Sequence, residues 1–163
     1  MENIAILTGG DSAEYTISLM SADTVHQFLD KSKYNSFIIL LKEGTYSYNN
    51  IEIDTSDFSC MIDKKKILFN KVFIALHGPP AENGLIQDYL DELEIPYTCC
   101  NASISALTFD KYTCNKTLTK LGFNCAESII LNTDDLIDLE AIVKSLRLPL
   151  FVKPNGAGSL FHG

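Results

Sequence analysis

The chain has 163 residues and a formal net charge of -8, with 46% hydrophobic and 21% charged residues. This length and apolar content suffice for one hydrophobic core and part of a second. The acidic balance argues against binding of nucleic acid or of an anionic membrane through bulk charge, whereas a few local lysines can still bind an anionic small molecule. We therefore expect a globular protein with neither nucleic acid nor membrane as its partner.

The cysteines and the apolar runs indicate the cellular compartment in which the protein is expected to work. The five cysteines are odd in number and none forms a C-x-x-C pair, so neither a disulfide framework nor a zinc site is expected. Apolar runs such as Phe37–Leu41 fall far short of the roughly 18 residues that indicate a membrane span. The opening Met-Glu-Asn-Ile lacks the pattern of a secretory signal. These observations predict a cytoplasmic protein.

The first hundred residues predict alternating strands and helices. In chain order they are a strand at Asn3–Leu7, a helix at Ile17–Leu29, a strand at Phe37–Leu41, a hairpin at Gly44–Ile53 that turns at Asn49-Asn50, a strand at Val72–Leu76, a helix at Leu85–Leu93 and an extended piece at Ile95–Thr98. The polar stretch Thr55–Lys66 suggests a short helix at most. This order predicts an α/β fold, a Rossmann-like and mainly parallel sheet with helices on both faces.

The organisation changes near Asn101. The expected elements there are helices at Ser103–Phe109 and Lys111–Leu121 with Gly122 as a cap, a strand at Ser128–Leu131, a helix at Asp134–Leu146 and a strand at Leu148–Lys153. A glycine-rich loop follows the last strand, and the chain stops ten residues after Lys153. Such a loop normally leads into further structure. We therefore expect a first domain at 1–100 and the beginning of a second at 101–163.

Polar residues cluster where three of the predicted strands end. The clusters are Thr8–Ser18, His77–Gly84 and Lys153–Ser159. Ligands of open α/β sheets bind beyond the carboxyl ends of the strands, so these clusters are candidate binding loops. The first lacks the G-x-G-x-x-G order of a dinucleotide site, and the last lacks the G-K-[ST] end of a Walker A motif.

Each cluster has one residue with a chemical role and an ordinary structural alternative. His77 follows a buried strand directly and precedes a glycine and two prolines, which set the turn. Glu14 could accept a hydrogen bond from a substrate ammonium, and Ser18 could cap the next helix. Lys153 could bind a phosphate. The alternatives are a loop histidine with satisfied hydrogen bonds, a solvated carboxylate and a surface lysine.

Four stretches of the chain, in this order, carry a family resemblance. The stretches are LTGGDSAEYTISLMSA, VFIALHGPPAENGLIQDYLDELEIPYT, SALTFDK and FVKPNGAGS. Together they resemble the N-terminal half of the D-alanine–D-alanine ligases of the ATP-grasp superfamily. The resemblance implies a pre-ATP-grasp substrate-binding domain followed by a partial ATP-grasp central domain. It also implies an ATP-dependent carboxylate–amine ligase that makes the D-alanyl-D-alanine dipeptide of peptidoglycan through an acyl phosphate.

The resemblance implies roles for four residues around the first D-alanine. Glu14 would hold its ammonium group, Ile17 would line the pocket for its methyl group, and His77 would contact its carboxylate side. Ser159 would join a hydrogen-bond network with Glu14, so that Glu14, His77 and Ser159 form the expected catalytic set.

The resemblance also implies ATP and Mg²⁺. Lys111 and Lys153 would bind the phosphates of ATP. The magnesium ligands of the family lie beyond residue 163, so no metal-binding residue is expected in this chain. Two departures from the family pattern stand out: Asn83 replaces an aspartate, and Leu160 stands where a second serine usually follows Ser159.

Three readings remain open at this point. The first is the D-alanine–D-alanine ligase, expected as a homodimer and expected not to ligate with these 163 residues alone, because at most two cations face ATP. The second is another ATP-grasp ligase, for example one that makes D-alanyl-D-lactate. The third is a non-catalytic module that binds an amino acid or dimerises. The length of the complete open reading frame would separate the ligases from the module.

Overall fold

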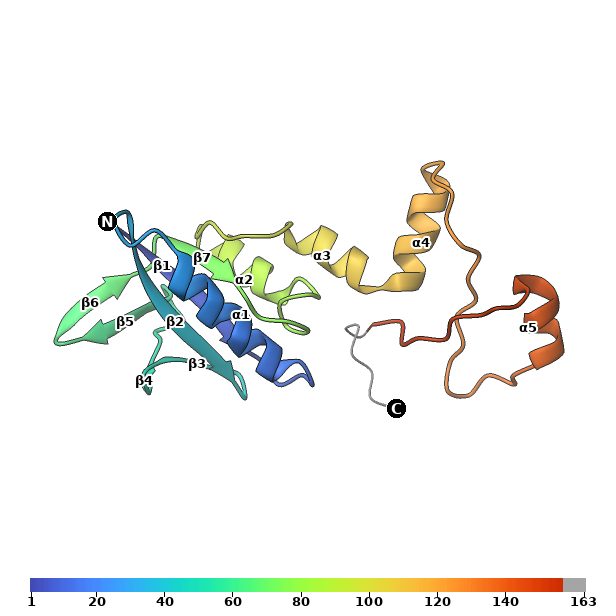
Figure 1. Cartoon of the computed structure of the whole chain (residues 1–163), viewed down its shortest axis with the longest axis horizontal. Helices are drawn as coiled ribbons and strands as arrows, with labels where there is room; N and C mark the ends of the chain where they lie inside the picture. The colour runs from blue at the N-terminus through green and yellow to red at the C-terminus, as the bar shows by residue number, and fades with distance from the viewer. Residues whose placement is uncertain (157–163) are drawn as a thin grey trace. The chain divides into compact units, whose positions relative to one another are not determined.

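A computed structural model describes residues 1–156 of the chain (Figure 1). The chain divides into two compact units, Met1–Ser105 and Ala106–Gly163. No helix in the described residues combines the length and the apolar character needed to cross a membrane.

The first unit is built on a five-stranded sheet with the order β4-β3-β2-β1-β7. Strand β1 (Glu2–Gly9) pairs in parallel with β2 (Tyr34–Lys42) on one side and with β7 (Lys71–Ile74) on the other. Strands β3 (Thr45–Tyr48) and β4 (Ile51–Glu52) extend the sheet as an antiparallel hairpin. The strands and the hairpin predicted in the first unit are confirmed, and β1 lies between two parallel strands.

Helix α1 (Tyr15–Phe28) covers one face of this sheet (Figure 1). Ile4 and Ile6 of β1 pack there with Ala22 of the helix and with Ala75, which follows β7. Side chains two residues apart on a strand point to the same face, so the even positions of β1 form the α1 side of the core.

The odd positions of β1 face the opposite side. Ala5 and Leu7 belong to a larger buried cluster with Ile86 and Leu90 of helix α2 (Leu85–Glu92). A strand covered on both faces needs apolar residues without alternation, which is what β1 has. The predicted α/β fold with helices on both faces is therefore confirmed.

The stretch Thr55–Lys66 does not contain the short helix that its polarity suggested. Strands β5 (Ser59–Ile62) and β6 (Lys65–Leu68) form a separate antiparallel hairpin instead. Asp63 and Lys64 take positive φ values of 48° and 63°, which a two-residue hairpin turn requires. Three consecutive lysines, residues 64–66, make this stretch polar, so the sequence did not indicate two strands here.

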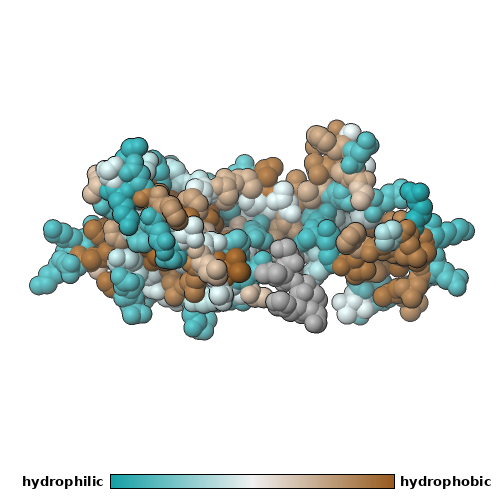
Figure 2. All heavy atoms as spheres, in the orientation of Figure 1, coloured by the Kyte–Doolittle hydropathy of each residue, from teal (hydrophilic) through white to brown (hydrophobic). Residues whose placement is uncertain are grey.

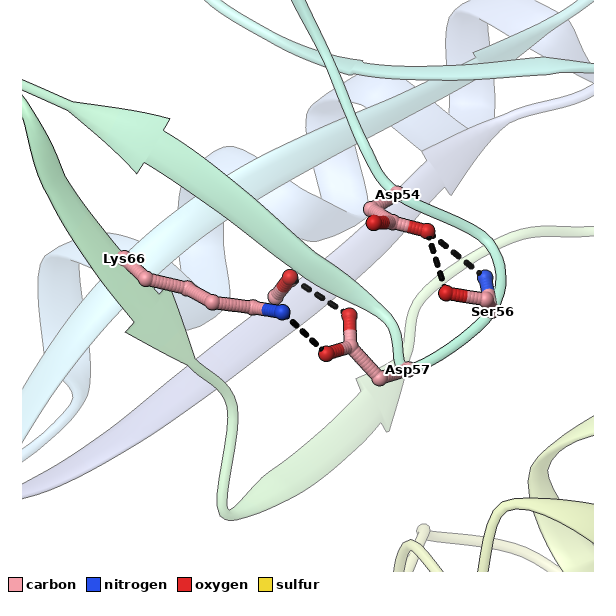
Figure 3. Close-up of polar contacts among 5 residues, drawn as sticks. Asp54, Ser56, Asp57 and Lys66 are labelled. Carbon is pink, nitrogen blue, oxygen red and sulfur yellow. Dashed lines mark hydrogen bonds and ion pairs between the residues drawn. The ribbon is translucent and has the colours of Figure 1, made fainter.

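Polar contacts hold the base of the β5–β6 hairpin (Figure 3). The Asp54 carboxylate accepts hydrogen bonds from the backbone N–H and the hydroxyl of Ser56, at 3.0 and 2.6 Å. The Asp57 carboxylate accepts a hydrogen bond from Ser59 and forms an ion pair with Lys66. These hydrogen bonds hold the pKa of both aspartates below the usual value. The hairpin is thus fixed to the segment that precedes it.

The segment after α2 closes the β7 edge of the sheet. Val72 donates its N–H to the carbonyl of Pro96 at 2.8 Å, and Thr98 donates to the carbonyl of Val72 at 3.0 Å. These bonds make a single parallel bridge between Val72 and Tyr97. The extended piece that was predicted at Ile95–Thr98 therefore acts as a short cover on the edge strand.

The boundary between the two units falls inside helix α3 (Ala102–Phe109). The second unit also contains α4 (Lys111–Lys120) and α5 (Leu139–Leu146). Asp110 caps α4 by accepting the N–H of Thr113, and Asp138 caps α5 by accepting the N–H of Ala141. The last helix therefore begins at residue 139 and not at 134, because Asp138 is the residue that caps it.

The two strands predicted in the second unit are wrong. Neither Ser128–Leu131 nor Leu148–Lys153 is a strand, and no strand occurs between residues 106 and 156. A strand needs a partner for its backbone N–H and C=O groups, and the described residues of this unit supply none. No residue in that range is buried, and Figure 2 shows hydrophobic surface around α5.

Candidate active site

The candidate site begins where strand β7 gives way to the turn at His77. Gly78 has a φ of +77°, and a Cβ at this position would lie 2.9 Å from the hydroxyl oxygen of Ser12. Only glycine meets both conditions without a shift of its neighbours. The Gly78 carbonyl then accepts the N–H groups of Ala81 and Glu82, both at 3.1 Å, which closes the turn.

Three serines contact His77. Ser18 accepts the backbone N–H of His77 at 2.9 Å, and Ser12 donates its hydroxyl to the His77 carbonyl at 3.1 Å. The hydroxyl oxygen of Ser21 lies 3.0 Å from the ring Nε2. All three serines come from the β1–α1 loop or from α1, so this part of the chain fixes a residue that follows another strand.

Glu14 immediately precedes α1, and it is only 7% exposed. Its Oε2 lies 3.5 Å from the position that a Cβ on Gly78 would take, so the carboxylate faces the His77–Gly78 turn. Within residues 1–156 no group donates a hydrogen bond to this carboxylate. Glu14 is therefore mostly buried as a residue, unlike most glutamates in polar loops. A bound cation could pair with its carboxylate.

The structure thus brings Glu14 and His77 together, from loops that follow two neighbouring parallel strands. Ile17 lies one turn beyond Glu14 on α1 and is 41% exposed, so its side chain is open to contact. Ser159 lies outside the described residues, and its role stays a prediction.

Sequence reasoning missed how the serines act. Ser18 was expected to cap the helix, but the helix begins at Tyr15 and Ser18 lies buried inside it, where it donates to the carbonyl of Glu14 at 3.2 Å. Ser12 and Ser21 were not singled out. The signal was present, since residues 18 and 21 are three apart and share one face of a helix.

One further polar side chain near the end of β1 has no partner in the described residues. Thr8 is fully buried, and its hydroxyl oxygen makes no hydrogen bond there. Thr8 precedes Gly9 and Gly10, and Gly10 donates its N–H to the carbonyl of Leu41 at 2.8 Å. The loop that leads to Glu14 is therefore anchored to β2.

The two candidate ATP-binding lysines belong to the second unit. The backbone N–H and the Nζ of Lys111 donate to the carbonyl of Asn155, at 3.2 and 3.4 Å. The side chain of Asn155 accepts the N–H of Tyr112 at 2.8 Å. These contacts place the loop after Lys153 against the start of α4, although the contacting residues are more than 40 positions apart. Lys153 itself is exposed.

A cavity of about 420 Å³ lies elsewhere in the second unit, between α4 and the segment 125–129. None of the candidate site residues lines it. Within the described residues no group of three or more His, Cys, Asp or Glu side chains could hold a metal ion.

Comparison with known proteins finds similarity to D-alanine–D-alanine ligases. The family model for the D-ala D-ala ligase N-terminus matches residues 3–66. The chain is 42% identical over 163 residues to the D-alanine–D-alanine ligase of Phocaeicola vulgatus, covering 97% of this chain and 50% of that protein. It is 46% identical to the ligase of Flavobacterium johnsoniae, covering 99% of this chain and 51% of that protein. The chain thus spans about half the length of the curated relatives that it matches.

Solved structures with a similar fold include a D-alanine–D-alanine ligase and a D-alanyl-alanine synthetase. The D-alanine–D-alanine ligase of Bacillus anthracis complexed with ATP superposes with a TM-score of 0.75 at 28% identity, covering 96% of this chain and 48% of that one. D-alanyl-alanine synthetase A of Vibrio cholerae gives a TM-score of 0.74 at 27% identity, covering 88% and 44%. In sequence and in fold, the chain is therefore similar to the N-terminal half of D-alanine–D-alanine ligases.

Proposed function

We propose that this chain supplies the first D-alanine site, and part of the ATP site, of an ATP-dependent D-alanine–D-alanine ligase. The observation that carries the proposal is the Glu14 carboxylate, which is 7% exposed, faces the His77–Gly78 turn and has no donor within the described residues. An amino-acid ammonium group provides the positive charge and the hydrogen-bond donors that such a carboxylate lacks.

The rest of the substrate fits around this contact. A zwitterion bound through its ammonium at Glu14 can turn its carboxylate toward a donor on the neighbouring strand end, and His77 is the titratable side chain there. Ile17 follows Glu14 by one helical turn and is 41% exposed, so it can contact the methyl group of D-alanine. Ser159, which lies outside the described residues, would complete the proposed set through a hydrogen bond with Glu14.

The proposed reaction has two steps. The carboxylate of the bound D-alanine attacks the γ-phosphorus of ATP, which gives an acyl phosphate and ADP. The amine of a second D-alanine then attacks the acyl carbon, and phosphate leaves as the peptide bond forms. Phosphoryl transfer depends mainly on positioning and on charge stabilisation, so the role of Glu14 and His77 is to fix the attacking carboxylate.

Lys111 and Lys153 are the proposed phosphate ligands. The carbonyl of Asn155 binds Lys111, so the loop that follows Lys153 is held beside it. The Asp110 carboxylate already accepts a hydrogen bond from the first turn of α4. Hydrogen bonds from Thr113 and Asn155 hold the pKa of this carboxyl group below its usual value. We therefore expect the two lysines, and not the N–H groups of the helix, to contact the phosphates. Mg²⁺, which supplies charge neutralisation in such reactions, would be held by residues outside those described.

Domain roles, oligomeric state and compartment complete the proposal. Residues 1–100 would form the substrate-binding pre-ATP-grasp domain, and residues 101–163 the beginning of the ATP-grasp central domain. We propose a homodimer that works in the cytoplasm. Free cysteines at all five positions agree with a reducing compartment. Light scattering of the purified protein would test the dimer.

The test is a D-alanine titration of the protein made from the complete open reading frame, with Glu14→Gln beside the matched control Glu92→Gln. Glu92 is exposed at the end of α2. Loss of a charge-assisted hydrogen bond should raise the KM for the first D-alanine by roughly 10- to 100-fold in Glu14→Gln only. Equal KM values in the two variants would contradict the proposed site.

Product analysis separates the rival activities. D-alanine, D-lactate and D-serine are offered as the second substrate, and the products are identified by mass. The VanG D-Ala:D-Ser ligase of Enterococcus faecalis shares the fold, with a TM-score of 0.74 at 24% identity, so the fold does not set the second substrate. The proposal requires D-alanyl-D-alanine as the main product. Binding of D-alanine with no ATP consumption would instead favour a non-catalytic module.

A further inference from the structure

Ser21 makes an unusual contact for a serine inside a helix. Its hydroxyl oxygen lies 3.0 Å from the Nε2 of His77, a residue 56 positions later in the chain. The hydroxyls on either side of it behave differently: Ser18 donates to the carbonyl of Glu14 and Thr24 to that of Met20, in each case four residues back. Ser21 is thus directed out of its helix toward the ring.

We propose that Ser21 is a positioning residue, whose hydroxyl donates to Nε2 and holds His77 as the neutral tautomer with its proton on Nδ1. A neutral imidazole has one donor nitrogen and one acceptor nitrogen. If Nε2 accepts from Ser21, the ring can donate only through Nδ1. That nitrogen has no hydrogen-bond partner within the described residues, so its N–H remains available to a ligand.

Because the backbone of His77 is already fixed, the contact of Ser21 with the imidazole ring determines how the ring is oriented. Ser18 and Ser12 already fix the N–H and the carbonyl of His77, at 2.9 and 3.1 Å. Only the two side-chain torsions of the ring remain, and Ser21 restricts both by binding the far end of the ring. The serine therefore selects the position of Nδ1 as well as its protonation.

The tautomer matters for the substrate, and this step rests on the proposed function. A D-alanine carboxylate placed beside His77 needs a donor. With the proton on Nδ1 the ring offers one, whereas with the proton on Nε2 the ring would present a lone pair to the anion. Ser21 thereby favours binding of the carboxylate that is to be phosphorylated, without touching it.

The first test is the ring nitrogen spectrum of the 163-residue protein labelled with ¹⁵N-histidine, recorded at a pH where the rings are neutral. The chain has three histidines. His26 is an internal reference, because its Nδ1 lies 2.9 Å from the hydroxyl of Ser36, so this ring meets a serine through the opposite nitrogen. We expect His77 to show an unprotonated Nε2 and a protonated Nδ1. A protonated Nε2 in the wild-type protein would overturn the proposal without any variant.

Variants then connect the tautomer to Ser21. In Ser21→Ala the two His77 nitrogens should shift toward a mixture of tautomers while the His26 signals stay in place. Ser21→Thr keeps the hydroxyl and should restore the wild-type pattern. The matched control is Thr24→Val, which removes a hydroxyl one turn along the same helix that bonds only a helix carbonyl. Unchanged His77 signals in Ser21→Ala would refute the role.

Turnover by the complete protein gives the functional readout. Ser21→Ala should raise the KM for the first D-alanine roughly two- to tenfold, the range of one neutral hydrogen bond, and Ser21→Thr should recover most of it. A changed kcat with an unchanged KM would speak against positioning. If the wild-type protein does not use D-alanine, the proposed function fails, while the ring spectra still decide whether Ser21 sets the tautomer.

Discussion

Both units of this chain are rich in large apolar side chains, but among the described residues only those of the first unit are buried. In the first unit Leu7, Ile39 and Leu90 are at most 1% exposed. In the second, Leu136 and Phe151 are 101% and 94% exposed. The difference lies in the partners: β1 is flanked by two parallel strands and covered on both faces, whereas the predicted strands of the second unit have no described strand beside them. Apolar sequence becomes a core only where a sheet or helix is present to cover it.

Replacing one leucine in each unit by alanine should give the largest difference in stability between the two units. Leu90→Ala empties a fully buried site in the first unit and should lower the free energy of unfolding by about 2–5 kcal/mol. Leu136→Ala in the second unit removes a fully exposed side chain and should change it by less than about 0.5 kcal/mol. Urea denaturation followed by circular dichroism measures both. Similar losses for the two variants would show that Leu136 is covered in solution.

Two glycines with nearly the same φ allow a second comparison. Gly84 has a φ of +92°, and an added Cβ would lie 2.5 Å from the carbonyl oxygen of Ala102. Gly122 has a φ of +89° and nothing within 4 Å of that position. Gly122→Ala should therefore cost only the conformational term of about 1 kcal/mol, whereas Gly84→Ala should cost at least about 2 kcal/mol because a backbone contact must also move.

Thermal unfolding of the two glycine variants separates the conformational cost from the cost of moving the backbone contact. A larger shift of Tm is expected for Gly84→Ala than for Gly122→Ala. Equal shifts would mean that the Ala102 backbone yields without cost, so that the conformational term alone acts at both positions.

The smallest effect concerns Tyr89, which donates to the carbonyl of Thr55 at 2.8 Å. Desolvation, with nearby Tyr46, Asp54 and Asp57, raises the pKa of Tyr89 to about 12 from 10.0. A raised pKa in the folded state means that the contribution of the phenol is complete below pH 10.0 and is lost as the pH rises toward about 12.

The variant Tyr89→Phe tests this sign. At neutral pH it should be less stable by about 1 kcal/mol, since one hydrogen bond is lost. Between pH 10.0 and about 12 its free energy of unfolding should fall less steeply than that of the wild-type protein. Urea midpoints across this range give both quantities. Parallel curves for the two proteins would rule out the titration of Tyr89 as a source of alkaline instability.

The first unit could be predicted well from sequence, because its signals are local. The unbroken apolar run of β1 and the asparagine pair before β4 specify their elements without reference to the rest of the chain. The β5–β6 hairpin could not be predicted in this way: its turn is Asp63-Lys64, and the burial of Phe58 and Cys60 depends on β2, β3 and α2. The aromatic contacts of Phe58 with Tyr46 of β3 and Tyr89 of α2 are tertiary.

The sequence predicted the main residues of the candidate site, but it did not predict the hydrogen bonds that hold them in place. Glu14 and His77 follow strands that pair with each other, so the general rule for parallel sheets brings them to one edge. The hydroxyls that hold His77 depend on the rotation of α1 about its axis, which the packing of Ala22 against β1 decides. The burial of Glu14 also escaped prediction, since a glutamate in a polar loop is most often solvated.

The edges of the sheet limit how two copies of this protein can meet. On one side the sheet ends in β4, which has two residues, and on the other side the backbone of β7 is partly occupied by Pro96 and Thr98. Long, unpaired edge strands allow chains to join by adding strand to strand, and among the described residues neither edge of the five-stranded sheet offers one. Joining two copies edge to edge through this sheet is therefore disfavoured, and a homodimer that used this sheet would have to form through contacts between side chains.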